Sequence, residues 1–112
     1  MTISELAKKS GINPKVFAEI IELAKKYQID QVILFGSRAR GDYRERSDID
    51  LAFCGGKGDY FTLDIDEETS TLLEFDIINL DKPVRSELLE SIEREGIIFY
   101  TQGSAFGCKM II

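Results

Sequence analysis

Histidine and tryptophan are absent from the sequence, and cysteine and proline each occur only twice in 112 residues. Without histidine, catalytic triads that use its imidazole as the base are excluded. A zinc site is excluded as well, because Cys54 and Cys108 do not show the spacing of metal ligands. Any metal in this protein must therefore be a hard cation bound by carboxylates. We expect the two cysteines to be reduced.

Long apolar runs are also absent. No stretch approaches the roughly 20 apolar residues that span a bilayer, and the first residues, MTISELAKKSG, lack the apolar core of a secretory signal. These absences predict a cytoplasmic protein that does not associate with a membrane. A chain of 112 residues has the size of one domain.

Charge is distributed unevenly along the chain, whose formal net charge is −6. This balance argues against broad nucleic-acid binding, which needs a basic surface. Residues 58–81 contain eight acidic residues and no lysine or arginine. Four arginines, in contrast, lie close together at Arg38, Arg40, Arg44 and Arg46. A small basic cluster in an acidic protein suits a small polyanion. The alternative is a solvated loop that happens to be rich in arginine.

Two helices are predicted in the N-terminal quarter. Residues 13–27 place apolar side chains on one helical face and begin with Asn-Pro, an N-cap followed by a first-turn residue. The shorter helix before it has a capping-box pair at Thr2 and Glu5 and ends at Gly11. A helix-turn-helix is conceivable here, but the acidic charge disfavours DNA binding.

Strands and a helix alternate in the rest of the chain. The strands are predicted at 31–36, within 47–56, at 74–79 and at 97–100, and a helix is predicted at 83–96. Residues 59–70 are ambiguous from the residues alone, and the tail at 102–112 has no clear period. This order predicts an α/β or α+β fold in one small pair of layers.

Asp48 and Asp50 form the first candidate site. Strand side chains alternate, so residues two apart project from the same face. Two ionised carboxylates on one face repel each other, and a divalent cation such as Mg²⁺ between them would remove that repulsion. The alternative is that the pair lies at an exposed start of a strand and faces water.

Asp76 is the second candidate, since it lies inside the otherwise apolar segment LLEFDIINL. Burial of an unpaired charge is costly. If this strand pairs beside the strand of Asp48 and Asp50, the third carboxylate can join the same site. Three carboxylates can hold two cations about 4 Å apart, which activates an attacking oxygen and neutralises a leaving pyrophosphate. The alternative is a charge on an edge strand.

Gly36 and Ser37 follow the predicted strand at 31–36. A glycine there lets the main chain approach a ligand and take a positive φ. Ser37 can cap a following helix, whose N–H groups would then be available to a phosphate. By itself a Gly-Ser pair after a strand is also what an ordinary turn looks like.

The order of these residues resembles the signature of the DNA polymerase β-type nucleotidyltransferase superfamily, which is Gly-Ser, ten residues, then Asp-x-Asp. The segment GSRARGDYRERSDIDL, 36–51, keeps that spacing, and the later segments EFDIINL and LLESIEREGIIFY resemble the minimal nucleotidyltransferases. The resemblance implies an α+β fold with a small mixed sheet and helices packed on one face. It also implies one domain, with N-terminal helices at 1–28, a core at 29–101 and a tail of unclear role at 102–112.

The resemblance also assigns roles to residues. Gly36 and Ser37 would hold the triphosphate of ATP. Asp48, Asp50 and Asp76 would be catalytic and would bind two Mg²⁺ ions. Arg38 and Arg46 are predicted phosphate contacts on charge alone, because the family motif does not include them.

Chains of this size resemble the antitoxins encoded beside HEPN proteins. In that family the antitoxin transfers AMP from ATP to a tyrosine of the HEPN ribonuclease. The resemblance therefore implies an enzyme whose partners are a nucleoside triphosphate and a HEPN-domain toxin, with a homo-oligomer possible. Two alternatives remain: a binding module that neutralises its partner by contact, and a nucleotidyltransferase that acts on a small molecule or an RNA end.

Overall fold

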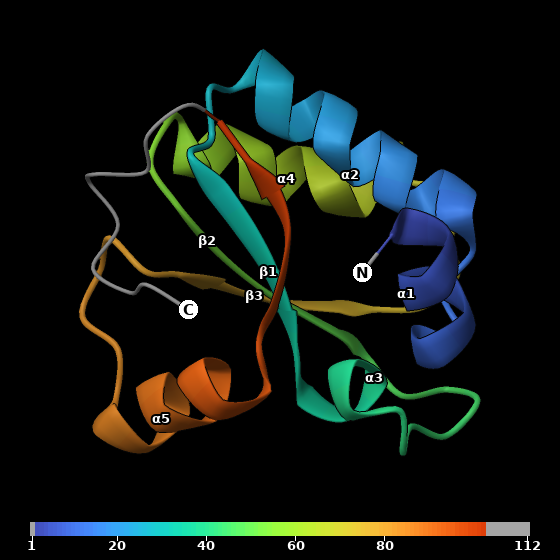
Figure 1. Ribbon diagram of the computed structural model, residues 1–112. Helices are drawn as coiled ribbons and strands as arrows, with labels where there is room; N and C mark the ends of the chain where they lie inside the picture. The colour runs from blue at the N-terminus through green and yellow to red at the C-terminus, as the bar shows by residue number, and fades with distance from the viewer. Residues whose placement is uncertain (1, 103–112) are drawn as a thin grey trace.

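A four-stranded mixed β-sheet forms the centre of the protein, with helices on both of its faces (Figure 1). The computed structural model describes residues 2–102. In chain order, its elements are α1 (Ile3–Ser10), α2 (Pro14–Lys26), β1 (Gln31–Phe35), α3 (Gly36–Arg40), β2 (Ile49–Cys54), α4 (Gly58–Glu68), β3 (Phe75–Asn79), α5 (Ser86–Glu95) and β4 (Ile97–Thr101). The predicted strands are all present, and the ambiguous segment at 59–70 is mostly helix.

The N-terminal helices begin and end as predicted. The hydroxyl of Thr2 accepts a hydrogen bond from the N–H of Glu5, whose carboxylate accepts one from the N–H of Thr2, both at 3.1 Å. Gly11 ends α1 in the left-handed conformation, with φ of 69°. Asn13 caps α2 by accepting a hydrogen bond from the N–H of Lys15. These contacts are local in sequence, so the pattern of residues was enough to predict them.

The strand order of the sheet is β3-β2-β1-β4. β1 runs antiparallel to both β2 and β4, whereas β2 and β3 are parallel. In this register Phe35 pairs with Asp50, and Asp50 pairs with Asp76. The C-terminal end of β1 and the beginnings of β2 and β3 therefore meet at the same end of the sheet.

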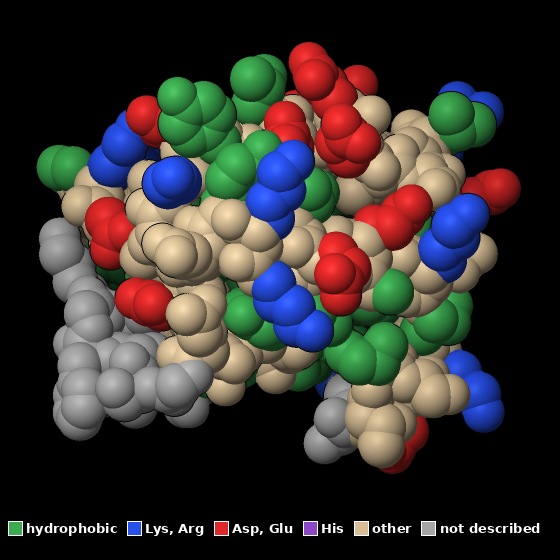
Figure 2. Space-filling model, turned by 90° about the horizontal axis from the view of Figure 1, so that it is seen from above, with side chains coloured by type: hydrophobic (Ala, Val, Ile, Leu, Met, Phe, Trp, Pro, Cys, Tyr) green, Lys and Arg blue, Asp and Glu red, His purple; other side chains and the backbone are tan. Residues whose placement is uncertain are grey.

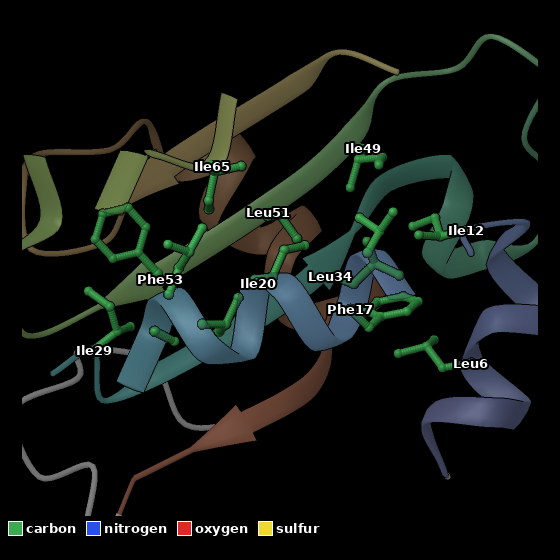
Figure 3. Close-up of a cluster of buried hydrophobic side chains, with 14 of the residues drawn as sticks. Leu6, Ile12, Phe17, Ile20, Ile29, Leu34, Ile49, Leu51, Phe53 and Ile65 are labelled. Atoms are coloured by element: carbon green, nitrogen blue, oxygen red, sulfur yellow. The ribbon is translucent and has the colours of Figure 1, made fainter. Parts of the chain in front are cut away.

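Two apolar clusters lie on opposite faces of the sheet. The larger one packs α1, α2 and α4 on the sheet and includes Phe17, Leu34 and Phe53 (Figure 3). The smaller one packs α5 on the other face and includes Ile33 and Ile92. The prediction of helices on one face only was wrong. β1 and β2 are buried on both faces, and an apolar face of a sheet needs a covering layer.

The outer surface of the α2 and α4 layer carries both acidic and basic side chains (Figure 2). This is the expected solvent side of amphipathic helices. Within residues 2–102 no helix has the length and apolarity needed to cross a bilayer.

Cys54 is buried in β2 and is disulfide-bonded. The prediction of a reduced state was therefore wrong for this residue. Cys108 and the rest of the predicted tail after Gln102 lie outside the described residues.

Candidate functional site

The candidate site lies where β1 ends and where β2 and β3 begin. The sheet register places Asp50 between Phe35 on one side and Asp76 on the other. Gly36 and Ser37 follow Phe35 directly, as the first residues of α3. The three segments predicted to form the site, which are far apart in sequence, are thus neighbours in the structure.

Asp50 and Asp76 lie side by side on neighbouring strands, which are about 4.8 Å apart in a sheet. Their flanking residues Leu51 and Ile77 pack into the larger apolar cluster, so by alternation both carboxylates project toward the face that α5 covers. Asp48 lies two residues before Asp50, just outside β2. The prediction that the two strands pair and bring these carboxylates together is confirmed.

The environment of Asp50 disfavours its charged form. Its burial, together with the negative charges of Asp76 and Asp48, raises the pKa of Asp50 to about 6. Asp48 and Asp76 are exposed, whereas Asp50 is partly buried. The two exposed carboxylates therefore add to the effect of burial on Asp50, and the positive charge of Arg40 does not offset them.

Oxygen donors of this kind suit a hard cation such as Mg²⁺, and a cation there would offset the burial and the carboxylate repulsion that raise the pKa of Asp50. Within residues 2–102, however, no group of three acidic side chains is arranged to hold a metal ion as the side chains stand. The donor chemistry fits the ion, but the protein alone does not form a complete cage. The assignment of Asp48, Asp50 and Asp76 as metal ligands stays a prediction.

Gly36 has two structural reasons to be glycine. Its φ of +76° lies in the left-handed region, where other residues are strained. The space that a Cβ atom would fill is occupied by the carboxylate of Asp50. The turn from β1 into α3 can therefore pass directly beside the partly buried carboxylate only if this residue has no side chain.

Ser37 lies in the first turn of α3 and does not cap it, because the N-cap position is Phe35, whose side chain makes no capping hydrogen bond. The predicted cap was wrong by two residues. Ser37 nevertheless lies next to Gly36 at the site, so its predicted contact with a phosphate remains compatible with its position. No contact in residues 2–102 tests that role.

Arg38 does not have the role predicted for it. Its side chain is buried, with 1% of the residue exposed. Its guanidinium donates to three main-chain carbonyls, those of Ser10 at 2.8 Å, Ser47 at 2.9 Å and Glu45 at 3.1 Å. Arg38 also lies over the ring of Tyr43, 4.6 Å from its centroid. The expected phosphate contact is therefore replaced by a structural one.

The contacts of Arg38 fix the loop between α3 and β2. They join this loop, residues 41–48, to the C-terminal end of α1, and the ring of Tyr43 packs where a side chain of Gly11 would lie. Burial lowers the pKa of Arg38 without removing its charge in the normal pH range. Because Asp48 ends this loop, the anchor positions one of the candidate carboxylates.

Arg46 is exposed in the same loop, so its predicted phosphate contact is sterically open and stays a prediction. Arg40, which the sequence did not single out from its neighbours, forms ion pairs with Asp42 and with Glu95 at the end of α5. Arg40 lowers the pKa of Asp50, whereas Glu95 raises it. No local signal could have found this pair, because its two members are 55 residues apart.

Comparisons with known proteins identify the family and the fold. Residues 18–104 match the family described as "Polymerase beta, Nucleotidyltransferase". MJ0604 of Methanocaldococcus jannaschii, provisionally named a protein adenylyltransferase, is 39% identical over 75 residues, which are 67% of this chain and 72% of the relative.

Two solved structures have a similar fold. A crystal structure described as a toxin–antitoxin with AMP-PNP superposes with a TM-score of 0.61 at 20% identity, over 76% of this chain and 73% of that one. A mutant of the toxin–antitoxin MntA-HpeT gives a TM-score of 0.60 at 18% identity, over the same shares of the two chains. At these identities the likeness concerns the fold.

Proposed function

We propose, because this chain belongs to the polymerase β nucleotidyltransferase family, that it transfers AMP from ATP to a tyrosine hydroxyl of a partner protein. The observation that carries this proposal is the pairing of Asp50 with Asp76 beside the side-chain-free turn at Gly36. That arrangement places two carboxylates, one partly buried and one exposed, beside the main chain that begins α3.

In the proposed reaction the phenol oxygen of the acceptor attacks the α-phosphorus of ATP. A bond forms between that oxygen and phosphorus, and the bond from phosphorus to the bridging oxygen breaks. Pyrophosphate leaves with the electron pair, and the phenol proton passes to the carboxylate of Asp76. Asp76 suits this role because it is exposed at the beginning of the outer strand, where an acceptor can reach it.

Asp48, Asp50 and Asp76 would hold Mg²⁺ ions together with the triphosphate, whose oxygens would complete the coordination that the protein alone lacks. Bound Mg²⁺ would neutralise charge on the phosphates and on the leaving pyrophosphate. Gly36 and Ser37 would contact the triphosphate through the start of α3, and Arg46 would add a positive charge from the exposed loop.

The acceptor assignment draws support from the relatives. One relative bears the name of a protein adenylyltransferase, and the similar folds come from toxin–antitoxin complexes, one of them with an ATP analogue. We therefore assign the acceptor tyrosine to a HEPN-domain toxin and propose an antitoxin function in the cytoplasm. The chain would act as a single nucleotidyltransferase domain.

The test is to incubate the protein with Mg²⁺, ATP labelled at its α-phosphate, and a HEPN-domain toxin. We expect label on a tyrosine of that protein, located by mass spectrometry. Asp50→Asn should abolish labelling, whereas the exposed α5 variant Glu93→Gln should keep it. A tight complex that forms without label transfer would instead support a binding module, and label on an RNA end would support a different acceptor.

A further inference from the structure

The outer edge of β3 is an open strand edge. β3 is the last strand of the sheet and pairs only with β2 in the described part of the chain. The bonds at its two ends run from the N–H of Ile49 to the carbonyl of Glu74 and from the N–H of Leu80 to the carbonyl of Phe53. The main-chain N–H and C=O groups of the even-numbered residues therefore point to β2. Those of Phe75 and Ile77 point away from the sheet.

Natural proteins usually protect such an edge with lysine, proline or a bulge. The five-residue strand FDIIN has no lysine, proline or bulge, its register with β2 is regular, and its one charged side chain is Asp76 at the end near the candidate site. Within residues 2–102 no main-chain hydrogen bond engages the outward groups of Phe75 and Ile77. An edge of this kind is suited to accept an extended segment of another chain.

An open groove runs along this edge. It has a volume of about 640 Å³ and lies between α4 and the segment that leads into α5. Its apolar lining includes Leu63, Ile77, Ile78, Val84 and Leu88, and Leu63 is 57% exposed. A strand added to β3 would place alternate side chains on the two faces of the sheet, where these apolar groups lie.

We propose that this edge binds the segment of the partner protein that carries the acceptor tyrosine, and that β-strand pairing delivers the tyrosine to Asp76. This inference rests on the proposed transfer of AMP. A residue aligned with Asp76 on an added strand has its side chain on the same face as that carboxylate. Asp50 lies on that face as well, one strand further in.

Charge indicates the chemistry of the segment. Residues 58–81, which form α4 and β3, contain eight acidic residues and no basic one. Asp59 and Asp66 line the α4 side of the groove, whereas Lys82 and Arg85 line the opposite side, and Lys82 Nζ lies 3.4 Å from the carboxylate of Asp59. A segment with apolar residues around its tyrosine and with lysine or arginine at its ends is complementary to the α4 side of this groove, where Asp66 has no lysine or arginine beside it on α4. The basic ends of the segment would lie near the α4 side of the groove, which has acidic residues and no basic one.

A second copy of the chain fits this edge less well. If the β3 strands of two copies paired antiparallel, a two-fold axis perpendicular to the sheet would relate the copies. The α4 helices of both copies would then lie on the same face of the joined sheet. The acidic α4 of one copy would then lie beside the acidic α4 of the other, and like charges repel. A foreign basic segment does not meet this repulsion.

The test uses a synthetic peptide with a central tyrosine, valines on both sides and lysines at the ends. Two matched versions carry N-methyl groups on every second amide. One version is methylated at the odd-numbered amides and the other at the even-numbered amides, so each version keeps N–H donors along only one edge of the peptide strand. We expect one version to be adenylylated at least about tenfold more slowly than the parent peptide, since it loses the donors that face β3. The other version should lie within about threefold of the parent.

Equal rates for the two N-methylated versions would overturn the docking proposal. The proposal would also be overturned if the parent peptide were modified no faster than N-acetyltyrosine amide, which has the phenol but no strand. The same conclusion would follow if a peptide with glutamates at its ends were modified as fast as the lysine peptide. If N-acetyltyrosine amide accepts AMP in any of these cases, the proposed transfer stands and only the docking fails. If no phenol accepts AMP and Mg²⁺–ATP does not bind, both proposals fail.

A pair of variants tests the protein side. Ile77→Pro removes an outward N–H together with the isoleucine side chain, whereas Ile77→Ala removes only the side chain. The ratio of peptide transfer to N-acetyltyrosine amide transfer should fall at least about fivefold in the proline variant relative to the alanine variant. The same ratio in both variants would show that the edge N–H takes no part.

Discussion

The substitution Asp50→Asn should stabilise the metal-free protein at neutral pH, although Asp50 is a candidate catalytic residue. Its carboxylate is partly buried against Gly36 and near Asp48 and Asp76. Asparagine keeps nearly the same shape but carries no charge, so it removes the desolvation and the repulsion that disfavour the carboxylate.

The size and the pH range of the effect follow from the pKa of Asp50, which is raised from 3.8 to about 6 in the folded protein. Near pH 4 the folded state is protonated and the unfolded state is only partly ionised, so only a small part of the penalty is present. As pH rises through the interval from 4 to 6, the unfolded chain loses its proton first and stability falls. Above pH 6 the penalty is fully present, at about 1–3 kcal/mol, where the lower value allows for solvent screening of this partly exposed group.

Urea unfolding in EDTA measures this difference, with the parent and the variant compared at about pH 4 and at about pH 8. We expect the variant to be more stable by about 1–3 kcal/mol at the higher pH and nearly equal to the parent at the lower pH. Glu93→Gln, an exposed change on α5, is the matched control and should shift stability by less than about 0.5 kcal/mol at either pH. A variant that is less stable than the parent at pH 8 would refute the reasoning, because the charge of Asp50 would then be compensated.

Three further predictions address the remaining parts of the site. Mg²⁺ and ATP together should raise the melting temperature more than either alone, because each completes the binding of the other; a thermal scan with no joint shift at millimolar ligand would count against the site. Gly36→Ala should lower the free energy of unfolding by about 1–3 kcal/mol, since the new Cβ meets Asp50 at a positive φ, and urea unfolding measures it. Arg38→Lys should lose carbonyl contacts and destabilise the protein by about 2 kcal/mol or more. Arg46→Ala, in contrast, should leave stability within about 0.5 kcal/mol of the parent and weaken ATP binding in calorimetry. The reverse pattern for the two arginines would restore Arg38 as a phosphate contact.

Local sequence patterns determined much of the fold. The capping box at Thr2 and Glu5, the cap at Asn13 and the end of α1 at Gly11 all involve residues within four positions of one another. Their hydrogen bonds form within one turn of helix, so the residue types alone predict them. The family, too, follows from the order and spacing of Gly-Ser and Asp-x-Asp, because these residues lie on one short segment of the chain.

The order of the strands in the sheet was decided by the tertiary structure. The sequence placed Asp76 in a strand, but only the register shows that this strand pairs with β2 and aligns Asp76 with Asp50. The position of α5 on the second face likewise depends on which strands lie in the middle of the sheet. Pairing between distant segments depends on the packing of the whole chain, and a local pattern contains no information about its partner.

Arg38 shows most clearly what could not be predicted from the sequence. In the sequence it is one of four arginines next to a phosphate-binding signature, and its charge indicated a phosphate contact. In the structure three of its N–H groups donate to the carbonyls of Ser10, Glu45 and Ser47, which approach one another only when α1 and the loop pack together. Long-range contacts therefore decide which arginines of such a segment can contact a ligand. They bury some of these side chains and leave others, such as Arg46, in water.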